Sequence, residues 1–391
     1  MRMKGVSLSE FFKKYTMILA LVLVAIFFSI TTQGKILYPQ NINNLISQNG
    51  YVFVLAAGML LCILTGGNID LAVGSVVCFA GAIGAVMMNS GINIWIAVLV
   101  MLLTGLAIGF FQGFWISKIY VPAFIATLAG MYAFRGLSNV VLQGYAVSIS
   151  NKTFLNIFGG GADCYIPDFI GKGGSLNLTC LIAGIAIAAI YAIVTIRRVS
   201  VQKKMGIIQN TTPELLKAGI LCAVVIWLFY KLASYKGIPT VLIWVALVLG
   251  IYNYITNRTS IGRHLYAVGG NEKATALSGV NTRNVFLFAY ANMGLLAGLA
   301  GILTVARASS AQPTYGQGYE MDAIAACFIG GASAYGGTGK ISGVIIGAVL
   351  MGFINQGMSI MGIEANYQRV VKGIVLLLAV MFDVLSKRAK K

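Results

Sequence analysis

Long apolar segments follow one another along the whole of this 391-residue chain, with short polar stretches between them. A helix needs about 20 apolar residues to cross a hydrocarbon core of roughly 30 Å. Twelve segments approach that length, and we expect a helix in each: 15–32, 48–65, 70–88, 94–117, 122–142, 176–196, 215–234, 238–256, 285–306, 321–335, 342–361 and 368–385. The pattern predicts an all-α, polytopic membrane helix bundle of about twelve transmembrane segments, with residues 1–391 forming a single transmembrane domain.

Two of these segments do not have the pattern of a simple span. Segment 70–88 begins with Asp70 soon after a glycine pair, and segment 321–335 is short and ends in a glycine-rich break. Interrupted helices at membrane depth are tolerated only where protein or a water-filled path surrounds them. We therefore expect broken or half-helices at both places.

Glycine is abundant, with 47 residues, and it recurs at helical spacing inside predicted spans. Gly105, Gly109 and Gly113 repeat every four residues, as do Gly294 and Gly298, which predicts close helix packing through small residues. The stretches IGAVMM and IGAVLM, each downstream of a Gly-Gly pair, indicate either an internal repeat or a chance similarity in Gly- and Ala-rich sequence.

Basic residues give the chain a formal net charge of +18, although only 10% of its residues are charged and 58% are hydrophobic. They gather at the ends of predicted helices rather than on a soluble domain, which argues against a nucleic-acid partner. The main clusters are Arg2, Lys4, Lys13 and Lys14; Arg197, Arg198, Lys203 and Lys204; and Lys387, Arg388, Lys390 and Lys391. The positive-inside rule then predicts that both termini are cytoplasmic, which requires an even number of spans.

Motifs for a bound metal or nucleotide are not found in the sequence. Five of the six cysteines lie in apolar stretches and Cys164 lies in a polar loop, without a CxxC or Cys/His cluster, so we expect neither a metal site nor a disulfide framework. No GxxxxGK[ST] motif occurs, so ATP and Mg would be used by a separate ATPase and not bound by this chain.

A polar, glycine-punctuated loop from Arg258 to Arg283 is the most distinctive connection between apolar segments. Within it, Asn271 can cap a short helix that begins at Glu272 and Lys273, and Gly279 can end that helix. We interpret this loop as a docking surface for a partner ATPase, and an ordinary basic cytoplasmic loop is the alternative.

Acidic residues are scarce, with ten in the chain, and a charge at the centre of a bilayer costs about 2.5–3.5 kcal/mol. Asp70, Glu320 and Asp322 adjoin apolar segments, where a carboxylate either caps the start of a half-helix or contacts substrate. The single histidine, His264, lies in the polar loop, so the spans offer few groups for binding a coupling ion. This scarcity disfavours an ion-coupled secondary carrier, and a membrane scaffold or receptor without transport is a further alternative.

Three stretches of the sequence resemble the permease subunits of bacterial ABC importers for monosaccharides, the ribose, xylose and galactose type. They are TGGNIDLAVGS at 65–75, RHLYAVGGNEKATALSG at 263–279 and YEMDAIAACFIGG at 319–331, and VPAFIATL at 121–128 is a fourth match. The resemblance covers almost the whole chain. It implies a bacterial inner-membrane protein that works with a cytoplasmic ABC ATPase, an extracytoplasmic sugar-binding protein and a second permease copy in a homodimer.

The resemblance also implies roles for particular residues. Residues 257–284 would form the coupling loop to the ATPase, with contacts from Arg263, Gly270, Asn271, Glu272, Lys273, Ala274, Ser278 and Gly279. Five residues would line or shape the sugar pathway: Asn68, Asp70, Gln317, Glu320 and Asp322. Arg307 and Gln312 are candidate contacts for the binding protein at the outer face, and ordinary solvation of a loop is the favoured alternative for both.

Two departures from the family pattern bear on these expectations. The family usually has Glu-Ala-Ala where this chain has Lys273-Ala274-Thr275, so the charge at the ATPase contact would differ. Residues 176–234 add a helix pair and a basic linker that shorter members lack. This enlarged form is similar to permeases for xylose or for multiple monosaccharides, so the expected substrate is a pentose or a mixed set of aldoses.

Overall fold

The computed structural model describes residues 8–171, 174, 176–206 and 211–388, and helices occupy all twelve predicted segments. The helices are α1 (Leu8–Thr31), α2 (Pro39–Gln48), α3 (Gly50–Leu64), α4 (Val73–Asn89), α5 (Ile94–Ser117), α6 (Ala123–Leu142), α7 (Lys152–Phe158), α8 (Leu178–Lys204), α9 (Thr212–Ala233), α10 (Thr240–Arg258), α11 (Ser260–Gly270), α12 (Glu272–Leu277), α13 (Thr282–Ala308), α14 (Tyr319–Ile329), α15 (Ile341–Ile360) and α16 (Ala365–Arg388). A 3-10 helix, η1 (Lys35–Leu37), follows α1, and the two-residue strands β1 (Val147–Ser148) and β2 (Ser310–Ala311) pair antiparallel. The predicted all-α bundle is confirmed.

Fewer helices are simple spans than the hydropathy pattern indicates. Among the described residues, seven helices are long and apolar enough to cross a membrane, and the pair α2 and α3, bent by 41°, forms an eighth candidate. The apolar part of α1, Met17–Thr31, and the whole of α4 are shorter. Helix α14 has only 11 residues, so the expected half-helices at α4 and α14 are present.

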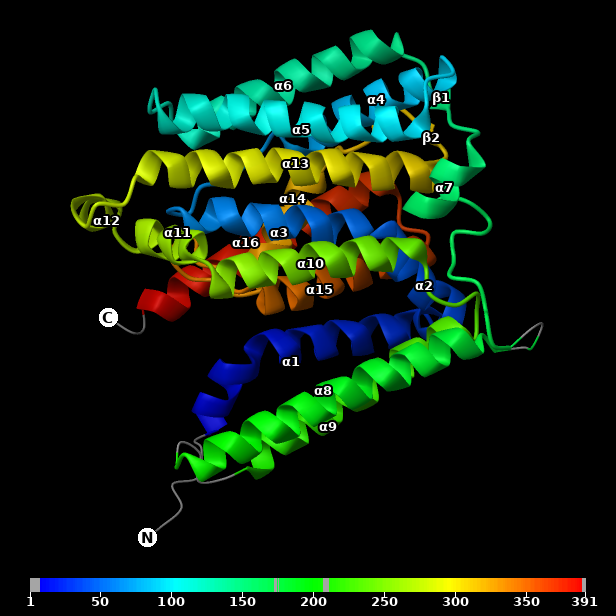
Figure 1. The fold of residues 1–391 in the computed structure, drawn as a ribbon, viewed down its shortest axis with the longest axis vertical. Helices are drawn as coiled ribbons and strands as arrows, with labels where there is room; N and C mark the ends of the chain where they lie inside the picture. The colour runs from blue at the N-terminus through cyan, green and yellow to red at the C-terminus, as the bar shows by residue number, and fades with distance from the viewer. Residues whose placement is uncertain (1–7, 172–173, 175, 207–210, 389–391) are drawn as a thin grey trace.

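The two ends of the described chain lie at one end of the bundle, together with α12 and the connected ends of α8 and α9 (Figure 1). Helix α7 and the β1–β2 ladder lie at the opposite end. The terminal basic residues Arg2, Lys4, Lys390 and Lys391 lie outside the described residues. Because both ends of the described chain lie at the same end of the bundle, the chain crosses the bundle an even number of times.

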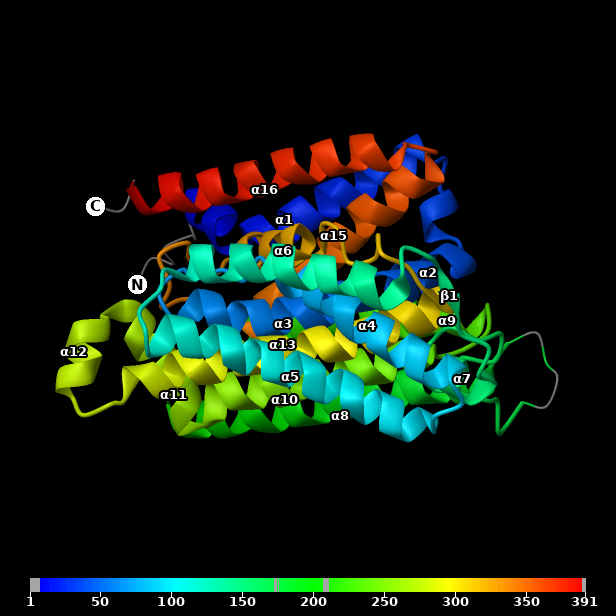
Figure 2. The ribbon, with the colours of Figure 1, turned by 90° about the horizontal axis from the view of Figure 1, so that it is seen from above.

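Helices α3 and α13 form the centre of the bundle, with α1 and α16 along one side and α8 and α10 along the other (Figure 2). Every residue of α3 except Tyr51 is buried. Helix α5 packs on α13 through the glycines that the sequence singled out: a Cβ built on Gly109 would lie 2.3 Å from the Tyr290 carbonyl oxygen and 2.8 Å from Gly294 Cα. Backbone contact of this kind is what small residues permit between membrane helices.

Helices α8 and α9 form a hairpin at the edge of the bundle, at the position of the predicted additional pair (Figure 1). The two helices pack on each other, where Gly184 leaves room for the Phe229 ring. A small apolar cluster joins the hairpin to α2 through Ile42, Ile46 and Leu232. The outward-facing side chains of both helices are largely apolar and exposed, which suits contact with lipid.

Candidate functional site

The two broken segments lie against each other near the N-terminal ends of their half-helices. Residues 65–72 lead from α3 into α4, and residues 312–318 lead from β2 into α14. A Cβ built on Gly74, in the first turn of α4, would lie 2.0 Å from the Gly316 carbonyl oxygen and 2.5 Å from Glu320 Oε2. The Glu320 carboxylate therefore lies at the start of α4, where the helix dipole favours negative charge.

Asp70 is buried immediately before α4, and its carboxylate binds the neighbouring backbone. Its Oδ1 accepts a hydrogen bond from the backbone N–H of Ala72 at 2.8 Å. Ala72 is the N-cap residue of α4, and its own methyl side chain makes no capping hydrogen bond. Asp70 thus binds a backbone N–H at the beginning of the half-helix, as expected for a structural role.

Asp322 is fully buried in the first turn of α14, but it does not cap that helix. Its Oδ2 accepts a hydrogen bond from the Tyr51 hydroxyl at 2.6 Å and forms a salt bridge with Lys372 Nζ at 2.9 Å. Tyr51 also stacks on Tyr319, with ring centroids 3.6 Å apart. The carboxylate therefore joins α14 to α3 and to α16, and the capping role expected for it is not observed.

The other two predicted pathway residues point elsewhere. The side-chain amide of Asn68 donates to the Thr65 carbonyl oxygen at 3.1 Å, which stabilises the turn after α3. Gln317 is exposed, and its Oε1 accepts a hydrogen bond from Arg369 on α16 at 3.0 Å. The structure thus gathers Asp70, Glu320 and Asp322 around the two half-helix starts, with Asn68 and Gln317 at the margins.

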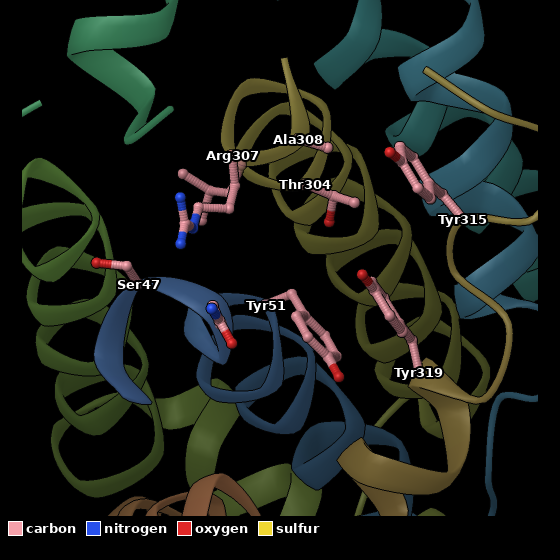
Figure 3. Close-up of a pocket in the computed structure, with 9 residues that line it drawn as sticks. Ser47, Tyr51, Thr304, Arg307, Ala308, Tyr315 and Tyr319 are labelled. Carbon is pink, nitrogen blue, oxygen red and sulfur yellow. The ribbon is translucent and has the colours of Figure 1, made fainter. Parts of the chain in front are cut away.

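An inner cavity of about 210 Å³ lies beside Tyr51 and Tyr319. Figure 3 shows Thr304 and Arg307 of α13 on one side of it and Ser47 and Tyr51 on the other. Gln48, Leu303, Ala308 and Tyr315 complete its lining. The loop that carries Tyr315 is held by Arg135 of α6, whose Nη1 donates to the carbonyl oxygens of Pro313 at 3.1 Å and Tyr315 at 2.6 Å.

An outer cavity of about 320 Å³ lies next to the inner one, toward the end of the bundle that carries α7. Its lining is mostly polar: Gln40, Asn43, Asn44, Ser47, Gly159, Gly161, Cys164, Tyr165, Tyr235, Lys236 and Arg307. Ser47 and Arg307 line both cavities. Residues 235 and 236 follow α9, so the segment after the peripheral hairpin forms part of the outer wall.

None of the five predicted pathway residues lines either cavity. Sequence reasoning found Arg307, as a candidate contact at the outer face, and missed Tyr51 and Lys372. A lysine inside predicted span 368–385 was a usable signal, because an ionisable residue at membrane depth needs a partner. The polar residues of α2 carried no such signal, because their segment precedes the predicted span 48–65.

The predicted coupling loop forms two short helices, α11, which packs against the bundle, and α12, which projects from it (Figure 1). Asn271 caps α12 as expected, since its Oδ1 accepts a hydrogen bond from the Ala274 N–H at 3.0 Å. Gly279, with a φ of 86°, follows the end of α12 in the left-handed region that favours glycine. The predicted contact residues are exposed: Arg263, Gly270, Asn271, Glu272, Lys273, Ala274, Ser278 and Gly279. Leu277 is 90% exposed on the same helix, an unusual position for a large apolar side chain.

Helix α11 connects this exposed segment to the end of α3 and to the loop after α14. A Cβ built on Gly269 would lie 1.8 Å from the Leu64 carbonyl oxygen and 2.4 Å from the Gly337 nitrogen. The Tyr266 hydroxyl donates to the Gly339 carbonyl oxygen at 2.8 Å. The two glycine pairs also touch, because a Cβ on Gly336 would lie 2.4 Å from Gly66 Cα. The end of α3, the loop after α14 and α11 therefore meet backbone to backbone.

Comparison with known proteins identifies the family of the chain. The family described as "Branched-chain amino acid transport system / permease component" matches residues 41–380. The xylose transport system permease protein of Haemophilus influenzae is 34% identical over 375 residues, covering 96% of this chain and 96% of that protein. The xylose transport system permease protein of Escherichia coli is 33% identical over 384 residues, covering 96% of this chain and 92% of its own length.

A ribose permease is similar to the same extent. The ribose import permease protein of Escherichia coli is 35% identical over 368 residues, covering 94% of this chain and 92% of that protein. No solved structure matches the chain. The extent of the family match and the identities over nearly full length show that this polytopic membrane chain belongs to that family of transport-system permease components.

Proposed function

We propose that this chain is the translocation subunit of an ATP-driven importer of monosaccharides, with a pentose such as xylose, or a mixed set of aldoses, as substrate. Its full-length similarity to xylose and ribose permeases supports the choice of sugars. The observation that supports the mechanism is the contact of α11, through Gly269 and Tyr266, with the end of α3 and the loop after α14, which adjoin the two broken segments.

That contact explains how a partner acts on the pathway. The exposed α12 binds a cytoplasmic ABC ATPase, which uses ATP and Mg, while the permease itself binds no cofactor. Because Gly269 touches the backbones at Leu64 and Gly337, no side chain lies between them to absorb a displacement of α11. Movement of α12 is therefore transmitted to the end of α3 and the loop after α14, and the broken segments rearrange.

The other partners follow from the same proposal. The end of the bundle that carries α12 and both ends of the described chain faces the cytoplasm, and the end with α7 faces outward, where a sugar-binding protein delivers substrate. The protein resides in the bacterial inner membrane and works with a second permease copy. The scarcity of acids free to bind a coupling ion disfavours a secondary carrier, since Asp322 is already paired with Lys372.

Uptake of labelled D-xylose into proteoliposomes tests the proposal, with the permease reconstituted alongside its ATPase and sugar-binding protein. We expect uptake that requires ATP on the side of α12 and does not respond to proton or sodium gradients. Uptake that persists without ATP and disappears when an ion gradient is removed would refute the importer assignment.

A variant of the coupling segment tests the role of α12 separately. Glu272→Lys combined with Gly279→Pro reverses an exposed charge and prevents the left-handed turn that ends the helix. We expect loss of ATP-driven uptake and of ATPase association, with unchanged membrane insertion. Lys203→Glu, an exposed charge reversal at the same end of the bundle, is the matched control and should retain both. ATPase association of the double variant at the wild-type level would contradict the docking role.

A further inference from the structure

Buried polar atoms without hydrogen-bond partners gather at the junction of the two cavities. Asn43 Oδ1, Ser47 Oγ and Arg307 Nε each lack a partner among the residues that the structure describes, and all three residues line the outer cavity. Asn43 is 2% exposed and Ser47 is 8% exposed. Buried polar groups in native proteins are nearly always hydrogen-bonded, so a cluster of unpartnered ones in one hollow points to a ligand.

The unpartnered atoms differ in hydrogen-bonding character, and this limits the ligand class. Asn43 Oδ1 only accepts, Arg307 Nε only donates, and Ser47 Oγ does both. Arg307 has no salt-bridge partner in the described part of the chain. An anion would satisfy the guanidinium but not the amide oxygen, and a cation would be repelled by the guanidinium. Neutral hydroxyl groups satisfy all three, because each hydroxyl donates and accepts.

The neighbouring lysine, Lys236, is an exposed part of the lining of the outer cavity, so solvent screens its charge. Lys236 Nζ donates to the Ala162 carbonyl oxygen at 3.4 Å and lies 5.5 Å from the centroid of the Tyr165 ring. The Tyr165 hydroxyl in turn accepts a hydrogen bond from Asn43 Nδ2 at 2.9 Å, which fixes the amide with its unpartnered oxygen held in place. This network positions the lining, in which Arg307 is the cation with a buried donor, Nε, that has no partner among the described residues.

The cavity volumes suit a small polyol. Pockets for small molecules usually measure roughly 300–1,000 Å³, and the outer cavity, at about 320 Å³, lies at the lower limit. The inner cavity is smaller, at about 210 Å³, and shares Ser47 and Arg307 with the outer one. One monosaccharide fits this space more closely than an oligosaccharide does.

We propose that the outer cavity is a monosaccharide-binding subsite of the permease itself, in which Asn43, Ser47 and Arg307 hydrogen-bond a neutral sugar before it passes to the inner cavity. The inference rests on the proposed function and adds a location and a set of contacts within one subunit. The inference also connects the peripheral hairpin to substrate binding, because Tyr235 and Lys236, which directly follow α9, form part of the wall of the subsite.

The test uses Ser47→Ala, for which a structural role and a binding role predict opposite results. Removing an unpartnered buried hydroxyl leaves stability unchanged or increases it, because no hydrogen bond is lost within the protein. Removing a sugar contact weakens binding by about three- to tenfold. Ser117→Ala is the matched control, since Ser117 Oγ is also buried and unpartnered but lines neither cavity.

Binding of labelled D-xylose, D-ribose and D-galactose is measured with the full-length permease and its ATPase in nanodiscs, without the sugar-binding protein. We expect at least one sugar to bind, Ser47→Ala to bind it three- to tenfold more weakly at an unchanged or higher melting temperature, and Ser117→Ala to match the wild type. Arg307→Met should weaken binding by roughly tenfold or more, because a charged donor is lost. Inorganic phosphate should not displace the sugar.

Wild-type uptake in the same preparation separates the two proposals. If ATP-driven sugar uptake occurs but no sugar binds, or Ser47→Ala binds as the wild type does, the subsite is refuted and the importer assignment stands. Displacement of the sugar by phosphate would likewise refute the assignment of a neutral ligand. If the cavities hold only water, no sugar will bind, and the subsite is refuted. If the wild type transports none of the three sugars with ATP, the proposed function itself fails.

Discussion

Removing one partner of the ion pair between Lys372 and Asp322 should be one of the most destabilising single changes in the bundle. Asp322 has a side chain that is 1% exposed, Lys372 one that is 17% exposed, and the Nζ–Oδ2 distance is 2.9 Å. The substitution Lys372→Met keeps a long apolar stem on α16 and removes the charge. Asp322 then retains one hydrogen bond, from Tyr51, while its Oδ1 already has no partner.

The magnitude follows from the burial of the carboxylate. Removing one member of a buried pair leaves an uncompensated buried charge and typically costs about 3–5 kcal/mol, more than a hundredfold in the folding equilibrium. Arg369→Met is the control on the same helix, since Arg369 is exposed and, within the described part of the chain, donates only to Gln317. A surface change of that kind usually alters the free energy of unfolding by no more than about 0.5 kcal/mol.

The assay is a double-mutant cycle on the free energy of unfolding of the permease in mixed micelles. Lys372→Met combined with Asp322→Asn removes both charges and keeps an amide beside the Tyr51 hydroxyl. We expect the double variant to recover most of the loss, with a coupling energy of at least about 2 kcal/mol. If Lys372→Met is as stable as Arg369→Met, or the two substitutions add without coupling, the inferred ion pair is wrong.

Three further predictions concern packing, pH and the coupling helix. Gly109→Leu should prevent α5 from packing on Gly294 of α13. We expect a lower yield of folded protein by size-exclusion chromatography for this variant, and no such fall for the control Gly136→Leu at an exposed position. Hydrogen bonds, first that from the Gly171 N–H, hold the pKa of Asp168 well below its usual value. The stability that the ionised carboxylate gives to the outer loop is therefore complete at neutral pH and is lost as the pH falls below about 4. Limited proteolysis between pH 7 and pH 3 should show this dependence in the wild type, and a similar dependence in Asp168→Asn would contradict it. Asn271→Ala should destabilise α12 by about 0.5–2 kcal/mol and weaken ATPase association, and wild-type affinity in a pull-down would count against the role of the cap.

The sequence was most informative where local physics determines the structure. Apolar length located a helix in every predicted segment, and the bounds of the span 94–117 agree with α5 at both ends. The cap and stop signals of α12 also agree, because an N-cap amide and a C-terminal glycine act within a few residues of their own positions. Hydropathy overestimated the number of simple spans, because an apolar composition does not reveal whether a segment is helical along its whole length.

Contacts between distant segments were not available from the pattern. The glycine pairs at 66–67 and 336–337 indicated two breaks, but nothing in the sequence shows that Gly336 packs on Gly66 or that Gly269 reaches both. The outer cavity escaped notice for a similar reason. Asn43 and Ser47 read as ordinary polar residues of a short helix, and only their burial against Arg307 gives them significance.

Cations inside the predicted spans are as informative about buried contacts as the acids are. Arg135, Arg369 and Lys372 all lie in such spans, and a buried carboxylate at membrane depth needs a counter-charge or several hydrogen bonds. The need for a partner follows from the sequence, but the choice of partner does not. Arg135 donates to two backbone carbonyl oxygens and Arg369 to Gln317, which leaves Lys372 for Asp322. Because each cation has several chemically reasonable partners, only the packing of α16 and α6 around α14 and the loop before it selects among them.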